Sequence, residues 1–287
     1  MSIPSIRLVA LFLALALASA GSANAQTSPT PPLPDDVVLR ELVRDGQTVW
    51  LYLPKGRQPS GLVVVPPSNG TLVTAPPLGG LDRPEHTPYA QAGFAVVSFS
   101  LSGEISGEVK LAEVRTAMAD FVKARAGVKD AQHAIAAALA EVPALSSGPI
   151  FAAGHSSAAN LALALTADDT RVKAVIAYAP VADAPKFISG SPLFAKLAGE
   201  VPGALELVRE LTPLALTPKL RVPVMIFHAQ DDDVAPIEGT RELARRLESA
   251  GNAPNLVTPA KGGHADVLLT EGVPAGVAWL SEQRTRR

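Results

Sequence analysis

The 287-residue sequence contains no cysteine and carries almost no net charge. The absence of cysteine excludes disulfides, thiol nucleophiles and thiolate metal ligands, so any chemistry must use oxygen and nitrogen side chains. The 25 Lys and Arg against 27 Asp and Glu give a net charge of -2. Such a balance offers no basic footprint for a nucleic-acid partner. After residue 25, no apolar run is long enough for stable membrane insertion.

What the sequence does contain is a large apolar fraction. Apolar residues make up 47% of the chain and charged residues 18%, which excludes wholesale disorder and predicts a sizeable buried core. The length alone allows one or two domains, and α/β chains of this size are often a single domain.

The first 25 residues have the pattern of a secretory signal peptide. Arg7 precedes the apolar run Leu8–Ala18, and Ala23-Asn24-Ala25 forms a small-residue cleavage site. A permanent anchor is the alternative, but this run is too short to span the roughly 30 Å of bilayer hydrocarbon. The sequence therefore predicts an exported protein, periplasmic or secreted, whose mature chain starts with a proline-rich extended leader over 26–36.

The remaining chain, 37–287, predicts an α/β fold. Asp45-Gly46 marks a hairpin between Val37–Val43 and Thr48–Leu53. From residue 62 onward, buried strands alternate with helices, which indicates a mostly parallel sheet covered on both faces. The expected strands are Leu62–Val65, Phe94–Phe99, Ile150–Ala153, Val172–Tyr178, Pro223–His228 and Leu256–Thr258; the expected helices are Glu108–Glu141 broken near Gly127, Ser157–Ala167, Ile237–Ala250 and Val273–Glu282.

Two connections between these elements receive their own interpretation. The proline-rich stretch 181–222 predicts a small lid, because long connections without strands are uncommon unless functional. The polar stretch Asp82–His86 predicts a surface loop.

A serine lies in the loop after the strand Ile150–Ala153. The loop reads Gly154-His155-Ser156-Ser157-Ala158 and leads into a helix. A strand, Gly-x-Ser-x-small turn and helix together are typical of a nucleophile elbow, which exposes the serine hydroxyl above the sheet. The alternative is a serine-rich turn that only caps the helix.

A serine hydroxyl needs a base and an orienting carboxylate to become nucleophilic. Both follow at the ends of later strands, where open α/β sheets place their ligands. The candidate acid is Asp232, with Asp231 and Asp233 as rivals, and the candidate base is His264. The order Ser, Asp, His is the one expected of α/β hydrolases.

On these motifs the chain from Val37 to the C-terminus resembles the alpha/beta-hydrolase superfamily, in particular its dienelactone-hydrolase and prolyl-oligopeptidase-like branches. The strand ending in His228, with Asp232 and Val234-Ala235-Pro236 after it, is similar to the acid-bearing segment of those branches. The resemblance implies Ser156 as nucleophile, His264 as base and Asp232 as triad acid. Ala158 and Ala229 stand where the family usually has glycine.

Acyl transfer also requires N–H donors for the developing oxyanion. We expect one from the backbone of Ser157 and the other from the loop after Leu62–Val65. Because Pro66 and Pro67 have no N–H, Ser68 offers the earliest donor there. Asn69, Phe187 and Phe194 are the candidates for the substrate pocket.

The sequence thus predicts an exported serine hydrolase that cleaves small-molecule carboxylic esters through an acyl-enzyme. A peptidase of the prolyl-oligopeptidase type and a non-catalytic binding protein of the same fold are the alternatives. The peptidases usually carry a propeller ahead of this domain, which disfavours that alternative. No nucleotide motif is present, and the Asp231–Asp233 run lacks a second ligand cluster, so no cofactor or metal is expected. Oligomeric state is not predicted.

Overall fold

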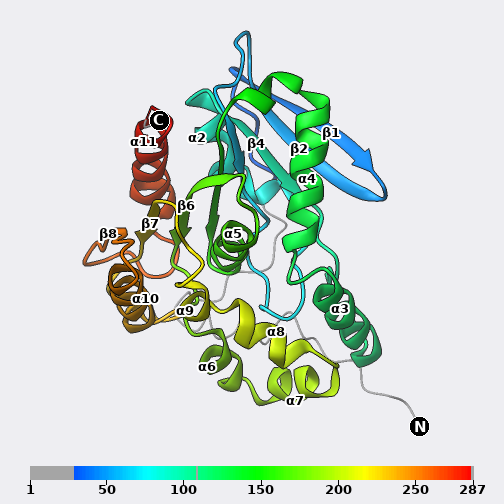
Figure 1. The fold of residues 1–287 in the computed structure, drawn as a ribbon. Coiled ribbons are helices and arrows are strands. Elements are labelled where there is room, and N and C mark those ends of the chain that lie inside the picture. The colour runs from blue at the N-terminus through cyan, green and yellow to red at the C-terminus, as the bar shows by residue number, and fades with distance from the viewer. Residues whose placement is uncertain (1–28, 108, 286–287) are drawn as a thin grey trace.

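The computed structural model describes residues 29–107 and 109–285, and an eight-stranded sheet forms its centre (Figure 1). The strand order is β1-β2-β4-β3-β5-β6-β7-β8. The strands are β1 (Val37–Arg44), β2 (Gln47–Pro54), β3 (Leu62–Val64), β4 (Ala95–Phe99), β5 (Ile150–His155), β6 (Val172–Tyr178), β7 (Val224–Phe227) and β8 (Asn255–Val257). Neighbours from β4 to β8 pair in parallel, and the β1–β2 hairpin joins β4 antiparallel at one edge. The predicted fold class is confirmed.

The edge hairpin follows from its two turn residues. Asp45 and Gly46 have φ angles of 48° and 82°. Two positive φ values fit the tight turn whose twist matches paired antiparallel strands, and Asp-Gly favours it. The register pairs Arg44 with Gln47, so the two strands meet directly at the turn.

Helices cover both faces of the sheet. One face packs against α2 (Arg83–Gln91) and α11 (Val273–Gln283), and the other against α4 (Val128–Glu141), α5 (Ser157–Asp168) and α10 (Ile237–Ser249). Helix α3 (Leu111–Lys123) precedes α4, and Gly127, with a φ of 86°, separates the two as the sequence predicts. The central strands β3 to β7 are almost wholly buried, which accounts for their largely apolar sequences.

Helix α2 contradicts the expected surface loop at Asp82–His86. A short 3₁₀ turn, η1 (Gly80–Asp82), leads into the helix, and His86 is fully buried. Pro84 stands in the first helical turn, where its missing N–H costs nothing. Tyr89 and Ala90 anchor the helix on the sheet. Tertiary packing thus overrides a polar, proline-containing sequence with weak helical propensity.

The stretch 181–222 folds into four short helices. They are α6 (Ala184–Ser189), α7 (Pro192–Glu200), α8 (Ala204–Leu211) and α9 (Pro213–Leu216). Proline stands in the first turn of α6, α7 and α9, so the prolines of this stretch start helices instead of excluding them. Figure 1 shows α7 and α8 beside α3, and the three helices share an apolar cluster that includes Met118, Leu197 and Val208.

The predicted signal peptide, 1–25, lies outside the described residues. The described part of the leader lies against the domain: Arg83 Nη1 donates to the carbonyl of Pro31 at 2.9 Å, and the amide of Val37 donates to Pro34. Among the described residues, no helix has the length and apolar character needed to cross a membrane.

Candidate active site

Ser156 occupies a strained turn between β5 and α5. Its φ of 56° and ψ of -120° lie in a region that residues with a side chain rarely adopt. The amide of Ser156 donates to the carbonyl of Tyr178 at 2.9 Å, which ties the turn to the neighbouring strand β6. Such strain is characteristic of functional sites and holds the side chain at the end of the sheet.

Glycine at position 154 makes this turn feasible. A Cβ atom there would lie 2.4 Å from the backbone carbonyl group of Ala158 in the first turn of α5. The side chain of Ala158 is itself buried. Small residues at both positions therefore allow β5 and α5 to approach closely, and alanine meets this requirement where the family usually has glycine.

The structure brings His264 and Asp232 together. The Nδ1 atom of His264 lies 2.8 Å from Oδ2 of Asp232. Because a carboxylate only accepts, Nδ1 carries the proton, and in the neutral ring Nε2 remains as the basic nitrogen. His264 is partly exposed, whereas the side chain of Asp232 is fully buried.

The rival acids lie elsewhere. Asp231 is exposed and accepts a hydrogen bond from the amide of Gly263 at 2.9 Å, and its partner in an ion pair is Lys261. Asp233 is also exposed. Among the described residues, no group of three carboxylate or imidazole side chains has an arrangement that could hold a metal ion.

Hydrogen bonds hold the carboxylate of Asp232 in its charged form. Oδ1 accepts from the amides of Val234 and Ala235 at 2.9 and 2.8 Å. Burial alone would raise the pKa of Asp232, but hydrogen bonds from His228 and His264 outweigh it and hold that pKa well below its usual range. A permanently charged acid suits a residue that orients an imidazole and stabilises its protonated form.

His155, at the end of β5, connects the turn at Ser156 to the loop that carries His264. Its Nε2 atom donates to the carbonyl of His264 at 2.9 Å, and the two imidazole rings lie 4.8 Å apart. Burial is the main reason that the pKa of His155 falls to about 4, so its ring is neutral near pH 7. His155 is thus a buried residue that packs beneath the turn.

The hydroxyl of Ser156 makes no hydrogen bond to His264 or to any other described residue. Contacts between nucleophile and base are often loose without substrate and tighten only when substrate binds. The hydrogen bond from His155 therefore holds the backbone of His264 beside the residue that precedes Ser156. The imidazole of His264 and the hydroxyl of Ser156 are not in hydrogen-bond contact.

Of the two predicted oxyanion donors, Ser157 is better placed. Its amide belongs to the first turn of α5, where N–H groups have no partner within the helix and the helix dipole favours negative charge. Ser68, in contrast, faces Asp82. Burial raises the pKa of Asp82 to about 6, and the amide and hydroxyl of Ser68 oppose this rise by hydrogen bonding to the carboxylate.

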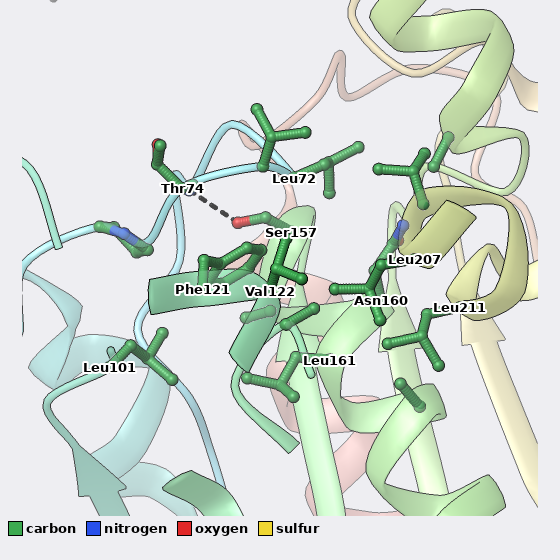
Figure 2. Close-up of a pocket in the computed structure, with 18 of the residues that line it drawn as sticks. Leu72, Thr74, Leu101, Phe121, Val122, Ser157, Asn160, Leu161, Leu207 and Leu211 are labelled. Carbon is green, nitrogen blue, oxygen red and sulfur yellow. Dashed lines mark hydrogen bonds between the residues drawn. The ribbon is translucent and has the colours of Figure 1, made fainter. Parts of the chain in front are cut away.

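An apolar cavity of about 50 Å³ lies beside Ser157 (Figure 2). The Ser157 hydroxyl stands at its polar end and accepts a hydrogen bond from the amide of Gly70 at 2.7 Å. Its walls come from the 67–76 loop, the end of α3, and the helices α5, α6 and α8. The apolar lining includes Leu72, Val73, Leu101, Phe121, Val122, Leu161, Ala204, Leu207, Val208 and Leu211.

The three pocket residues expected from the sequence do not line this cavity. Asn69 is exposed, Phe187 is partly exposed, and Phe194 is buried in the apolar cluster with α3. The lining from α3 and α8 is not evident in the sequence, because these residues have the pattern of ordinary core-facing positions in amphipathic helices. Only the fold shows that they meet next to Ser157.

Comparison with known proteins places this chain in a family. The profile of the prolyl oligopeptidase family matches residues 85–277, more than half of the chain. A search of curated protein sequences gives no significant match.

Among solved structures, acylaminoacyl peptidase from Pyrococcus horikoshii superposes with a TM-score of 0.70 at 14% identity, over 87% of this chain and 42% of the peptidase. A puromycin-hydrolysing peptidase from Mycobacterium tuberculosis gives 0.66 at 17% identity, over 90% and 41%. 2,6-dihydroxy-pseudo-oxynicotine hydrolase gives 0.61 at 20% identity, over 87% and 68%. This chain thus spans about two fifths of the two peptidases. Fold, motifs and profile agree: the chain belongs to the prolyl oligopeptidase family of α/β hydrolases.

Proposed function

We propose that the chain is a serine hydrolase in which Ser156 is the nucleophile, His264 the general base and Asp232 the acid of the triad. The observation that carries the proposal is the contact of 2.8 Å between His264 Nδ1 and Asp232 Oδ2, at the end of the sheet where Ser156 occupies a strained turn. Family membership supports the same assignment.

The mechanism begins when Nε2 of His264 takes the proton of the Ser156 hydroxyl as the oxygen attacks the substrate carbonyl carbon. The carbonyl oxygen becomes an oxyanion, and the amide of Ser157 donates to it. The intermediate then collapses, the bond to the leaving group breaks, and protonated His264 gives its proton to that group. Water, deprotonated by His264, attacks the acyl-enzyme in the same manner and releases the acid and free Ser156.

We assign carboxylic esters as the substrates, and the apolar cavity beside Ser157 as the site of a short acyl chain. The cavity has a volume of about 50 Å³, more than a single water requires and enough for a few methylene groups. Its mainly apolar walls favour a hydrocarbon over a polar group, at about 0.8 kcal/mol per buried CH₂.

A peptidase is the second candidate, favoured by the family match and by the peptidases among the structural relatives. The same triad can cleave an amide, provided that His264 delivers its proton to the leaving amine.

We further propose that the protein is exported, periplasmic or secreted, and acts on a small-molecule ester without cofactor, nucleic acid or stable membrane insertion. The signal-like pattern of residues 1–25 supports export.

The test is a set of p-nitrophenyl esters of increasing acyl length, assayed beside peptide amides. The proposal predicts turnover of short- and medium-chain esters, little turnover of amides, and no turnover of either by the Ser156→Ala variant. Amide cleavage with a higher kcat/KM than the best ester would replace the ester assignment by the peptidase. Ester cleavage that persists in Ser156→Ala would refute the nucleophile itself.

A further inference from the structure

A second buried histidine, His228, lies against the carboxylate of Asp232. His228 follows β7, and its side chain and that of Asp232 are both completely buried. The Nε2 atom of His228 lies 3.0 Å from Asp232 Oδ2 and 2.7 Å from the carbonyl oxygen of Ala235. On the other side of the ring, Nδ1 lies 2.7 Å from the hydroxyl of Thr240 in α10.

These partners determine where the proton of the ring lies. Both neighbours of Nε2 are oxygens that only accept, so Nε2 carries a hydrogen. In the neutral ring Nδ1 then accepts, and the hydroxyl of Thr240 donates to it. The hydrogen bonds thus run from Thr240 through His228 to Asp232, and His264 donates to the same carboxylate oxygen.

The contacts of His228 also complete a closed set of hydrogen bonds between His228, Asp232 and Ala235. Its N–H is within reach of both the Asp232 carboxylate and the Ala235 carbonyl. The amide of Ala235 in turn donates to Oδ1 of Asp232. His228 therefore fixes the carboxylate and also the turn whose amides hold it. A catalytic acid without such support would be free to rotate away from the geometry that its imidazole needs.

We propose that His228, oriented by Thr240, is a positioning residue that holds the Asp232 carboxylate in line with His264. This inference rests on the proposed function, because it presupposes that Asp232 and His264 act in the triad. His228 does not contact the reacting atoms and acts through Asp232. The titratable groups around the carboxylate are His228, His264 and His155, from the ends of β7 and β5 and the loop after β8.

The matched test compares His228→Phe with His228→Gln, using the ester that the wild-type protein cleaves best. Phenylalanine keeps the ring volume without an N–H, whereas the amide of glutamine can return a donor near the position of Nε2. We expect kcat to fall about tenfold in His228→Phe with KM within twofold of the wild type, and most of this loss to be recovered in His228→Gln.

The acid limb of the kcat/KM profile gives a readout that packing alone would not move. Without the N–H of His228, Asp232 Oδ2 accepts one hydrogen bond fewer, so its negative charge acts more strongly on His264. The protonated, inactive form of His264 is then favoured, and activity should disappear at a higher pH in His228→Phe than in the wild type and in His228→Gln. A folded His228→Phe variant with the wild-type kcat and acid limb would overturn the proposal. Equal losses in both variants with an unmoved acid limb would do the same.

If His228→Phe does not fold, Thr240→Val and Thr240→Ser take its place. Valine removes the hydroxyl that orients the ring, and serine keeps it. For Thr240→Val we expect kcat to fall about threefold and the acid limb to shift to higher pH, as in His228→Phe. For Thr240→Ser we expect wild-type values. Identical kinetics for the two variants would overturn the proposal.

Ser156→Ala in the same assay separates the positioning role from the proposed function. Residual activity in that variant refutes the triad. An activity that depends on Ser156 but is insensitive to His228 and Thr240 refutes only the positioning role.

Discussion

At the scale of single residues, the site depends on one serine held in an unfavourable backbone conformation. The strain at Ser156 persists because β5, β6 and α5 determine its backbone together, through the Tyr178 carbonyl and the close approach at Gly154. The sequence indicates this turn well, since only small residues fit around it. It does not reveal that the acid would be anchored by a second histidine, because that contact depends on how a turn and a helix pack.

Replacing Gly154 by alanine should destabilise the protein. The new Cβ would lie 2.4 Å from backbone atoms of Ala158, and overpacking of this kind costs about 1–3 kcal/mol or more. Gly199→Ala is the matched control, because its Cβ meets only one side-chain atom at 3.9 Å, within a helix that favours alanine. Chemical denaturation should show a clear loss of unfolding free energy for Gly154→Ala and none for Gly199→Ala; similar values for both would contradict the close approach.

The choice among the three aspartates is tested by exchanging each for asparagine. Asp232→Asn should lower kcat by orders of magnitude, because the amide holds the wrong tautomer of His264. Asp231→Asn should change it at most severalfold, since that carboxylate accepts from a backbone amide and is exposed. Steady-state ester hydrolysis measures both, and a larger effect at Asp231 or Asp233 would show that the acid is misassigned.

At the scale of elements, apolar periodicity and turn residues predict most of the fold. Buried strands such as Val224–Phe227 appear as uninterrupted apolar runs, and Gly127 marks the boundary between α3 and α4. The prediction fails in α2, where a polar, proline-containing segment becomes helical through tertiary packing. For the stretch 181–222 the sequence predicts a lid without strands but does not predict its four short helices. The cavity is hidden for the same reason, because its walls come from elements far apart in the chain.

The role of α8 in acyl selection is tested by enlarging one residue of the cavity wall. Ala204→Leu adds three carbon atoms to a space of about 50 Å³ beside Ser157. We expect kcat/KM for the longest acyl chain that the wild type accepts to fall at least tenfold, with little change for acetyl esters. Glu206→Leu, at an exposed position of the same helix, is the control and should leave the chain-length profile unchanged. An unaltered profile in Ala204→Leu would place the acyl chain elsewhere.

At the scale of the whole molecule, the sheet separates two buried apolar layers, one of which contains an unpaired histidine. The α2 side contains His86, which is fully buried, lies with its ring 5.3 Å from that of Tyr52 and makes no hydrogen bond to any described residue. Burial lowers the pKa of His86 to about 3. Between about pH 6.5 and pH 3, His86 therefore binds a proton in the unfolded chain but stays neutral in the folded protein.

This linkage predicts a specific loss of stability in acid. His86 destabilises the fold as the pH falls from about 6.5 towards about 3, by up to about 1.4 kcal/mol per pH unit, and not above pH 6.5. His86→Phe should remove this contribution and should be at least as stable as the wild type at pH 7, because an unpaired buried polar group is replaced by an apolar ring. Unfolding free energies at pH 7 and pH 5 test it; an equal loss between these pH values in both proteins would contradict the role of His86.

Labelling the folded protein with a fluorophosphonate, and locating the adduct by mass spectrometry, shows whether Ser156 is an activated nucleophile. We expect a single adduct on Ser156, and an unlabelled Ser156→Ala variant whose melting temperature is close to that of the wild type. A folded wild-type protein that remains unlabelled, or that carries the adduct on another serine such as Ser157, would contradict it.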